Sequence, residues 1–158
     1  MKKTMLSIML SLALTLSLSA TAFADVTQDS DPKTGTTTIS TSISPTYTVT
    51  IPADTTITFN TTSTSIGNIE LSSAQLDPGY AVKVSASAGA LENEADASKT
   101  IPYTLKSDGS AFTSAQYTVK GEYTALAVDI TEDDWNSAYA GSYSGTITFT
   151  VEYISTSN

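Results

Sequence analysis

The amino-acid sequence predicts an all-β protein, built as a single sandwich of two sheets with about 7–9 strands and one short helical turn near residues 131–138. From Thr36 onward, Thr, Ser, Val, Ile and Tyr dominate and alternate with a period of two, which is typical of half-buried strands. The alternating runs are short, and Gly, Pro, Asn or Asp separates them. Many short strands within one domain favour two packed sheets.

Residues 1–24 have the features of a secretory signal peptide. Lys2 and Lys3 precede an apolar stretch, which ends in the small residues Ala22 and Ala24 around Phe23. The stretch is too short for the roughly 20 apolar residues that a membrane-spanning helix needs. We therefore expect cleavage before Asp25, a secreted, extracellular or cell-surface location, and no membrane insertion once the signal is removed.

The mature chain is expected to start with a flexible leader at residues 25–35, followed by the sandwich domain at 36–158. The leader brings Asp29, Asp31, Pro32 and Gly35 close together, a composition that favours an irregular, exposed segment. The first strand is expected where Ile39, Thr41 and Ile43 share one face, because successive side chains of a strand point to opposite sides.

The following strands are predicted from the same parity. Residues expected to share a face within each strand are Tyr47, Val49 and Ile51; Ile57 and Phe59; Ile69 and Leu71; Tyr80, Val82, Val84 and Ala86; Ile101, Tyr103 and Leu105; Tyr117 and Val119; and Leu126, Val128 and Ile130. Asp77-Pro78-Gly79 predicts a type II turn, since Pro presets one angle and Gly tolerates a positive φ. The acidic, Ala-rich stretch 88–100 is expected to be an exposed loop.

The last part of the chain predicts a helical turn and a closing strand. Thr131 can cap the free amides of a helix start, and Glu132 to Asp134 suit the positive end of its dipole. In the closing strand, Ile147, Phe149, Val151 and Tyr153 lie on one face. This is the longest apolar alternation after the signal peptide, so we expect a central, buried strand.

Composition excludes several classes of function. The chain has seven Lys, no Arg and 16 acidic residues, for a net charge of −9, whereas nucleic-acid binding needs a basic patch that displaces counterions. There is no Cys, so disulfides and thiolate metal sites are excluded, and no His, the commonest general base and transition-metal ligand. We expect no nucleic-acid partner, no cofactor and no metal.

Motifs that could indicate catalysis or metal binding have simpler interpretations. Ser30 and Lys33 match the Ser-x-x-Lys spacing of β-lactam-handling enzymes, but Pro32 and the irregular leader do not supply the helix start that this chemistry requires. Acidic clusters could bind Ca²⁺, yet none has the spacing of a calcium loop, and solvated loops explain them better. These clusters are Asp29 and Asp31; Glu92, Glu94 and Asp96; and Glu132, Asp133 and Asp134.

Two segments resemble secreted bacterial surface proteins of the immunoglobulin-like type and fimbrial subunits. The first is Trp135-Asn136 with Ala140 to Tyr153, in which a Gly-x-Tyr-x-Gly turn at 141–145 leads into a long terminal strand. The second is Tyr47 to Pro52, which is similar to the opening strand of such modules. The resemblance implies an immunoglobulin-like sandwich and an extracellular structural or adhesive role.

These observations lead to three functional hypotheses. The first is a non-enzymatic structural or adhesive surface module, a fibre or pilus-type subunit that assembles by strand addition with itself or with other surface proteins. The second is a module that binds a carbohydrate or a host protein through Trp135, Tyr139 and Tyr143, with a core position of Trp135 as the competing interpretation. The third is an unrecognised hydrolase that uses two carboxylates.

Overall fold

A computed structural model describes residues 25–156, so the predicted signal peptide lies outside the described residues. The chain divides after Ser42 into two compact units. The described part of the first unit, residues 25–42, contains no helix or strand. The strand predicted around Ile39 and Ile43 is therefore not formed, and both side chains are exposed, at 92% and 66%. Alternation alone does not make a strand, because a strand also needs a neighbour to pair with.

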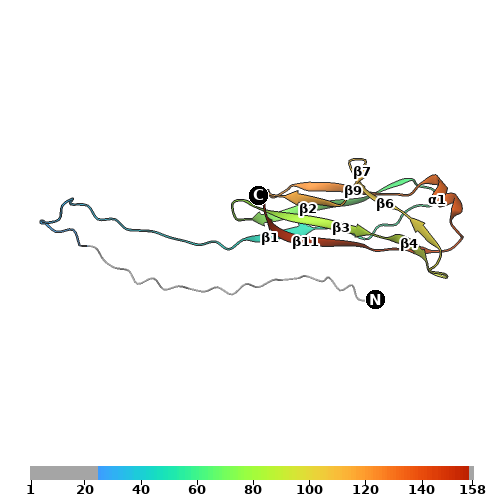
Figure 1. Cartoon of the computed structure of the whole chain (residues 1–158), viewed down its shortest axis with the longest axis horizontal. Coiled ribbons are helices and arrows are strands. Elements are labelled where there is room, and N and C mark those ends of the chain that lie inside the picture. The colour runs from blue at the N-terminus through green and yellow to red at the C-terminus, as the bar shows by residue number, and fades with distance from the viewer. Residues whose placement is uncertain (1–24, 157–158) are drawn as a thin grey trace. The chain divides into compact units, whose positions relative to one another are not determined.

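The prediction of an all-β sandwich is confirmed (Figure 1). The strands are β1 (Thr46–Thr50), β2 (Ser63–Gln75), β3 (Tyr80–Ala88), β4 (Ala90–Asn93), β5 (Thr100–Pro102), β6 (Thr104–Ser107), β7 (Ser110–Ala111), β8 (Ser114–Tyr117), β9 (Tyr123–Asp129), β10 (Tyr143–Ser144) and β11 (Ile147–Ser155). The helix α1 (Glu132–Ser137) falls in the predicted range. The described residues form eleven strands where about 7–9 were predicted. A break at Tyr103 divides one predicted strand into two shorter ones.

The strands form three antiparallel sheets. The five-stranded sheet has the order β1-β2-β9-β6-β7, and the second layer contains β11-β3-β8 and the smaller β10-β4-β5. Two stretches of chain pass between the two sheets of this second layer. One runs from β3 through Gly89 into β4, and the other runs from β10 through Gly145 into β11. A Cβ on Gly145 would lie 2.9 Å from the carbonyl oxygen of Ala90, so the two stretches approach closely there.

The stretch 88–100 is not the continuous loop that its composition suggested. It contains β4, which pairs with β5 through Leu91 opposite Ile101 and with β10 through Asn93 opposite Tyr143. Gly89 and the turn between Asn93 and Thr100 remain outside the strands. The Ala and Glu residues have low strand propensity, but pairing with strands from distant parts of the chain overrides it.

The core lies between the layers and agrees with most of the predicted faces. The exceptions are Ile57 and Phe59, which lie outside the strands, and Val119, which lies beyond β8 and is 60% exposed. The buried residues of the core are Ile69, Leu71, Val82, Val84, Ile101, Leu105, Tyr117, Leu126, Val128, Ile130 and Trp135. The turn at 77–80 is also as predicted, with a hydrogen bond from the Tyr80 amide to the Asp77 carbonyl and φ of 80° at Gly79. Thr131 caps α1 by accepting a hydrogen bond from the Asp134 amide.

The prediction of a central, buried closing strand is wrong. β11 is an edge strand that pairs along its whole length with β3 alone among the described strands. Its face does point inward, since Val151 lies opposite Val84 and Tyr153 opposite Val82. None of its residues is fully buried, however. The apolar alternation reports which face looks at the core, but it does not report how many neighbours the strand has.

Candidate functional site

The two layers differ in how they end at the two long sides of the sandwich. On one side the chain itself crosses from one layer to the other, because β7 is followed after two residues by β8. On the other side both layers end in an edge strand, β1 and β11. These edges are near each other, since the rings of Tyr47 and Tyr153 stack with centroids 5.8 Å apart. We call this side, bounded by β1 and β11, the open edge.

The inward row of β11 is incompletely covered at the open edge. Val151 faces the same side as its partner Val84, yet Val151 is 38% exposed and Val84 is fully buried. Phe149 and Ile147, in the same row, are half-buried and pack against the core. Every second residue of an edge strand also directs its N–H and C=O away from the sheet. From Ile147 to Ile154, the open edge thus combines apolar contact surface with backbone groups that face no second strand among residues 25–156, which is what an added strand requires.

A stack of three tyrosines closes one end of this edge. The Tyr153 ring lies between Tyr47 and Tyr80, with 4.9 Å between the centroids of Tyr80 and Tyr153. The Tyr153 hydroxyl accepts a hydrogen bond from the Asp77 amide at 2.7 Å and donates to the Asp77 carboxylate at 3.1 Å. Desolvation and the neighbouring Asp77 charge raise the pKa of Tyr153. The inward row from Val151 to Ile147 runs from this stack towards the α1 end of the sandwich, and Val151 is its exposed member.

The three residues predicted to bind a ligand do not share one surface. Trp135 is only 8% exposed, its indole N–H donates to the Thr61 carbonyl at 3.0 Å, and its ring meets Phe59 edge to face. Trp135 is therefore a core residue. Tyr139 is 64% exposed, and the Lys99 ammonium lies 4.9 Å from the centre of its ring.

Tyr143 supports the loop that carries Tyr139. Its ring is half-buried, and its hydroxyl donates a hydrogen bond of 3.0 Å to the Tyr139 carbonyl. Of the predicted trio, Tyr139 alone presents most of its side chain to solvent, so ligand binding here stays a prediction that rests on this residue.

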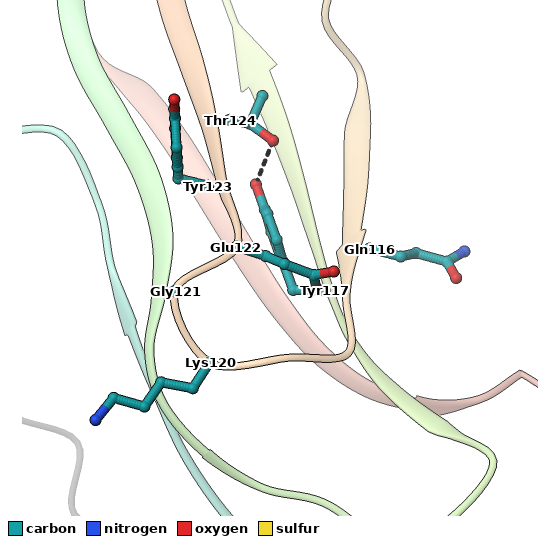
Figure 2. Close-up of a pocket in the computed structure, with 7 residues that line it drawn as sticks. All are labelled: Gln116, Tyr117, Lys120, Gly121, Glu122, Tyr123 and Thr124. Atoms are coloured by element: carbon teal, nitrogen blue, oxygen red, sulfur yellow. Dashed lines mark hydrogen bonds between the residues drawn. The ribbon is translucent and has the colours of Figure 1, made fainter.

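A shallow hollow lies beside the loop between β8 and β9 (Figure 2). Inside it, the Tyr117 hydroxyl donates to the Thr124 hydroxyl at 2.7 Å, and burial raises the pKa of Tyr117. Figure 2 shows Lys120 and Gln116 pointing away from each other, on either side of the Tyr117 ring. Tyr117 is a core residue, and its hydroxyl is already hydrogen-bonded.

Glu122 in the same loop is occupied by the backbone. Its carboxylate accepts hydrogen bonds from the amides of Val119 and Thr118, at 3.0 and 2.6 Å, and these bonds lower its pKa. A carboxylate held in this way organises the loop and is poorly suited to exchange protons near neutral pH.

The other acidic positions are used locally as well. A hydrogen bond from the Ser98 hydroxyl lowers the pKa of Asp96, and Lys106 together with Ser63 lowers that of Asp129. Within residues 25–156, no group of three or more carboxylates is close enough to hold a metal ion. Over the same part of the chain, no helix has the length and hydropathy to cross a membrane.

Comparison of the chain with protein-family models and with curated proteins finds no match. The resemblance of the closing segment to bacterial surface modules therefore stays a prediction. Sequence reasoning missed the open edge itself. Its signal was present in the parity of Val151 with Tyr153 and of Tyr47 with Val49, but identifying an edge requires knowing which strands are neighbours.

Proposed function

We propose that this protein is a non-enzymatic, extracellular structural or adhesive module that assembles into fibres by adding a strand to its open edge. The observation that carries the proposal is the inward-facing but 38% exposed Val151 on an edge strand. Exposed apolar side chains beside unpaired backbone groups favour pairing with another strand, because pairing buries the former and satisfies the latter. The signal-like residues 1–24 support export.

Natural sheets protect their edges with charges, prolines or bulges, and β11 uses little of this protection. Its single charged residue, Glu152, lies on the outer face, where it pairs with Lys83 at 3.7 Å. From Ile147 to Tyr153, the inward row contains Ile, Phe, Val and Tyr only. A strand with a long, unprotected apolar edge would aggregate without specificity unless a partner occupies it, and this supports assembly as the role of the edge.

Two substitutions on neighbouring residues test the proposal. Val151→Lys places a charge in the inward row, whereas Thr150→Lys places the same charge on the outer face of the same strand. The chain from Asp25 should form concentration-dependent oligomers and fibres by sedimentation and electron microscopy, Thr150→Lys should behave likewise, and Val151→Lys should stay monomeric.

Circular dichroism and thermal melting control for folding of both variants, and Val151→Ser is the milder substitute if Val151→Lys unfolds. A wild-type chain that stays monomeric at high concentration would refute the proposal. Assembly of a folded Val151→Lys or Val151→Ser variant to the same extent as Thr150→Lys would also refute it, because the open edge would then not be the contact.

A second candidate function is binding of a carbohydrate or host protein at Tyr139. The 64% exposure of this ring favours it, since exposed aromatic rings stack on sugars and partner proteins. Tyr139→Ala should abolish glycan-array or host-protein signal without changing the melting temperature. Retention of the signal in this variant would exclude Tyr139 as the contact.

A further inference from the structure

We propose that the strand added to the open edge is segment Thr36–Ser44 of a second copy of this chain. It runs antiparallel to β11, with Ile39 opposite Val151 and Ile43 opposite Ile147. This inference rests on the proposed function and names the partner and register of the same site.

The segment has the composition and length of a strand that lacks a neighbour. Ile39, Thr41 and Ile43 alternate with Ser and Thr, and the chain carries no charged side chain from Thr36 to Thr50. Ile39 and Ile43 are 92% and 66% exposed. In this register residues 36–43 lie opposite residues 154–147, which covers β11 except for its last residue. An exposed alternating segment and an uncovered apolar edge in one chain are complementary to each other.

The direction of the added strand follows from where the strands begin and end. Thr46, the first residue of β1, lies opposite Gln75, and Ser155, the last of β11, lies opposite Tyr80. The turn at 77–80 joins those partners, so β1 begins at the end of the sandwich where β11 finishes. Figure 1 shows α1 and β4 at the opposite end. β1 and β11 thus run in opposite directions.

The connection between the segment and β1 is short, because Pro45 alone separates Ser44 from Thr46. If the added segment is antiparallel to β11, its C-terminal end lies at the α1 end of the copy that accepts it. The sandwich of the donor copy then begins at that end, so the copies can stack head to tail into a fibre. A parallel segment would leave at the end where the acceptor's β1 begins, placing two like ends together and giving a closed pair. Fibre growth therefore selects the antiparallel direction.

The register follows from side-chain size. Parity requires the odd-numbered residues of the segment to face inward together with the odd-numbered residues of β11. Ile39 opposite Val151 covers the most exposed side chain of the inward row, and Ile43 then meets Ile147. Thr41 falls opposite the bulky Phe149. A shift by two residues in one direction would bring Ile39 against Tyr153, whose ring is already stacked on both sides. A shift in the other direction would leave Val151 opposite the smaller side chain of Thr37.

Disulfide cross-linking tests this register. Because the natural chain has no cysteine, every disulfide must come from the introduced residues. Ser40→Cys and Thr150→Cys, made in separate chains from Asp25 and mixed, place directly opposite residues within reach of a disulfide. Thr148→Cys and Glu152→Cys report the registers shifted by two residues in either direction. Under mild oxidation, Ser40→Cys should link to Thr150→Cys at least about tenfold faster than to the other two, because a disulfide needs Cα atoms within roughly 7 Å.

A second pair determines direction. Ser42→Cys should link to Thr148→Cys if the segment is antiparallel and to Glu152→Cys if it is parallel. Preferential linkage of Ser42→Cys to Glu152→Cys, or of Ser40→Cys to Thr148→Cys or Glu152→Cys, would overturn the proposed arrangement. Equal rates for all pairs would do the same, because they would indicate random collision.

Donor variants separate this inference from the proposed function. Ile39→Asp with Ile43→Asp should abolish assembly of a pure sample, while Ser40→Asp, on the opposite face of the segment, should still assemble. If the double variant assembles like the wild type and Val151→Lys does not, the open edge accepts a different strand and this inference fails alone. If the wild type does not assemble at all, the proposed function fails with it.

Discussion

Tyr153 on the last strand stacks on Tyr47 on the first, with ring centroids 5.8 Å apart, and so joins the edges of the two layers. An aromatic pair contributes about 0.5–1.5 kcal/mol beyond the apolar area that it buries. In this protein the contact also holds together β1 and β11, the two strands that bound the open edge.

Tyr47→Ala should lower the free energy of unfolding by about 1–2 kcal/mol, because it removes one ring of the stack and its partly buried area. Chemical denaturation followed by circular dichroism measures the change. Tyr123→Ala is the matched control, since Tyr123 is 64% exposed and forms no ring stack among the described aromatic residues. Equal effects of the two substitutions would show that the stack does not stabilise the edge.

Trp135→Ala should reduce stability by about 3–5 kcal/mol, a large part of the 5–15 kcal/mol of a typical domain. The substitution leaves a cavity beside Phe59 and an unpaired Thr61 carbonyl. Tyr139→Ala, a few residues further along the chain, should change stability by less than about 0.5 kcal/mol because its side chain is exposed. A Trp135→Ala protein that melts like the wild type would contradict the core position of this ring.

Gly145→Ala should destabilise the protein by about 1–3 kcal/mol, because its Cβ would press against the Ala90 carbonyl and the backbone would have to move. Gly89→Ala, between β3 and β4, is the control, since a Cβ there meets no atom within 4 Å. We expect that variant to be neutral or slightly stabilising. Thermal melting of both variants side by side measures this difference, and equal melting temperatures would contradict the steric role given to Gly145.

Acidification should remove a stabilising contribution of Glu122. Hydrogen bonds from two backbone amides hold the folded pKa of Glu122 below its ordinary value of 4.5. A carboxyl with a lowered folded pKa stabilises the fold fully above the unfolded value, and this contribution disappears as the pH falls through the folded value. The wild type should therefore lose stability below about pH 4.5.

Glu122→Gln should be less stable than the wild type at neutral pH, and the difference should shrink on acidification. Denaturation midpoints measured between neutral and strongly acidic pH test this expectation. Glu92→Gln is the control, because the exposed Glu92 carboxylate forms no hydrogen bond or ion pair with the described residues. A difference that stays constant with pH would contradict the role given to Glu122.

Much of the fold could be predicted because parity and turn chemistry are local properties. Val82 and Val84, Leu126 and Val128, the turn at 77–80 and the capped helix all follow from spacing and residue type. Pairing is not local in this sense. Ile39 and Ile147 carry the same alternation, yet the first has no partner strand among residues 25–156 and the second lies at an edge.

The candidate site was harder to predict for a related reason. Trp135 attracts attention as the single Trp of the chain, but its indole turned inward because the Thr61 carbonyl and Phe59 complete its surroundings. Val151 is an ordinary strand residue by type. Its importance comes from being inward-facing and uncovered at once, a combination that depends on the order of strands in the sheet.

If the segment is donated as proposed, the single residue between Ser44 and Thr46 would also give the chain a means of ending growth. A protease that cuts between the segment and β1 would leave the sandwich and its open edge intact while removing the strand that it donates. Such a shortened copy could still accept a neighbour but could not itself join one, so it would occupy a terminus. Fibre length would then depend on the ratio of shortened to intact copies, and the protease would set that ratio.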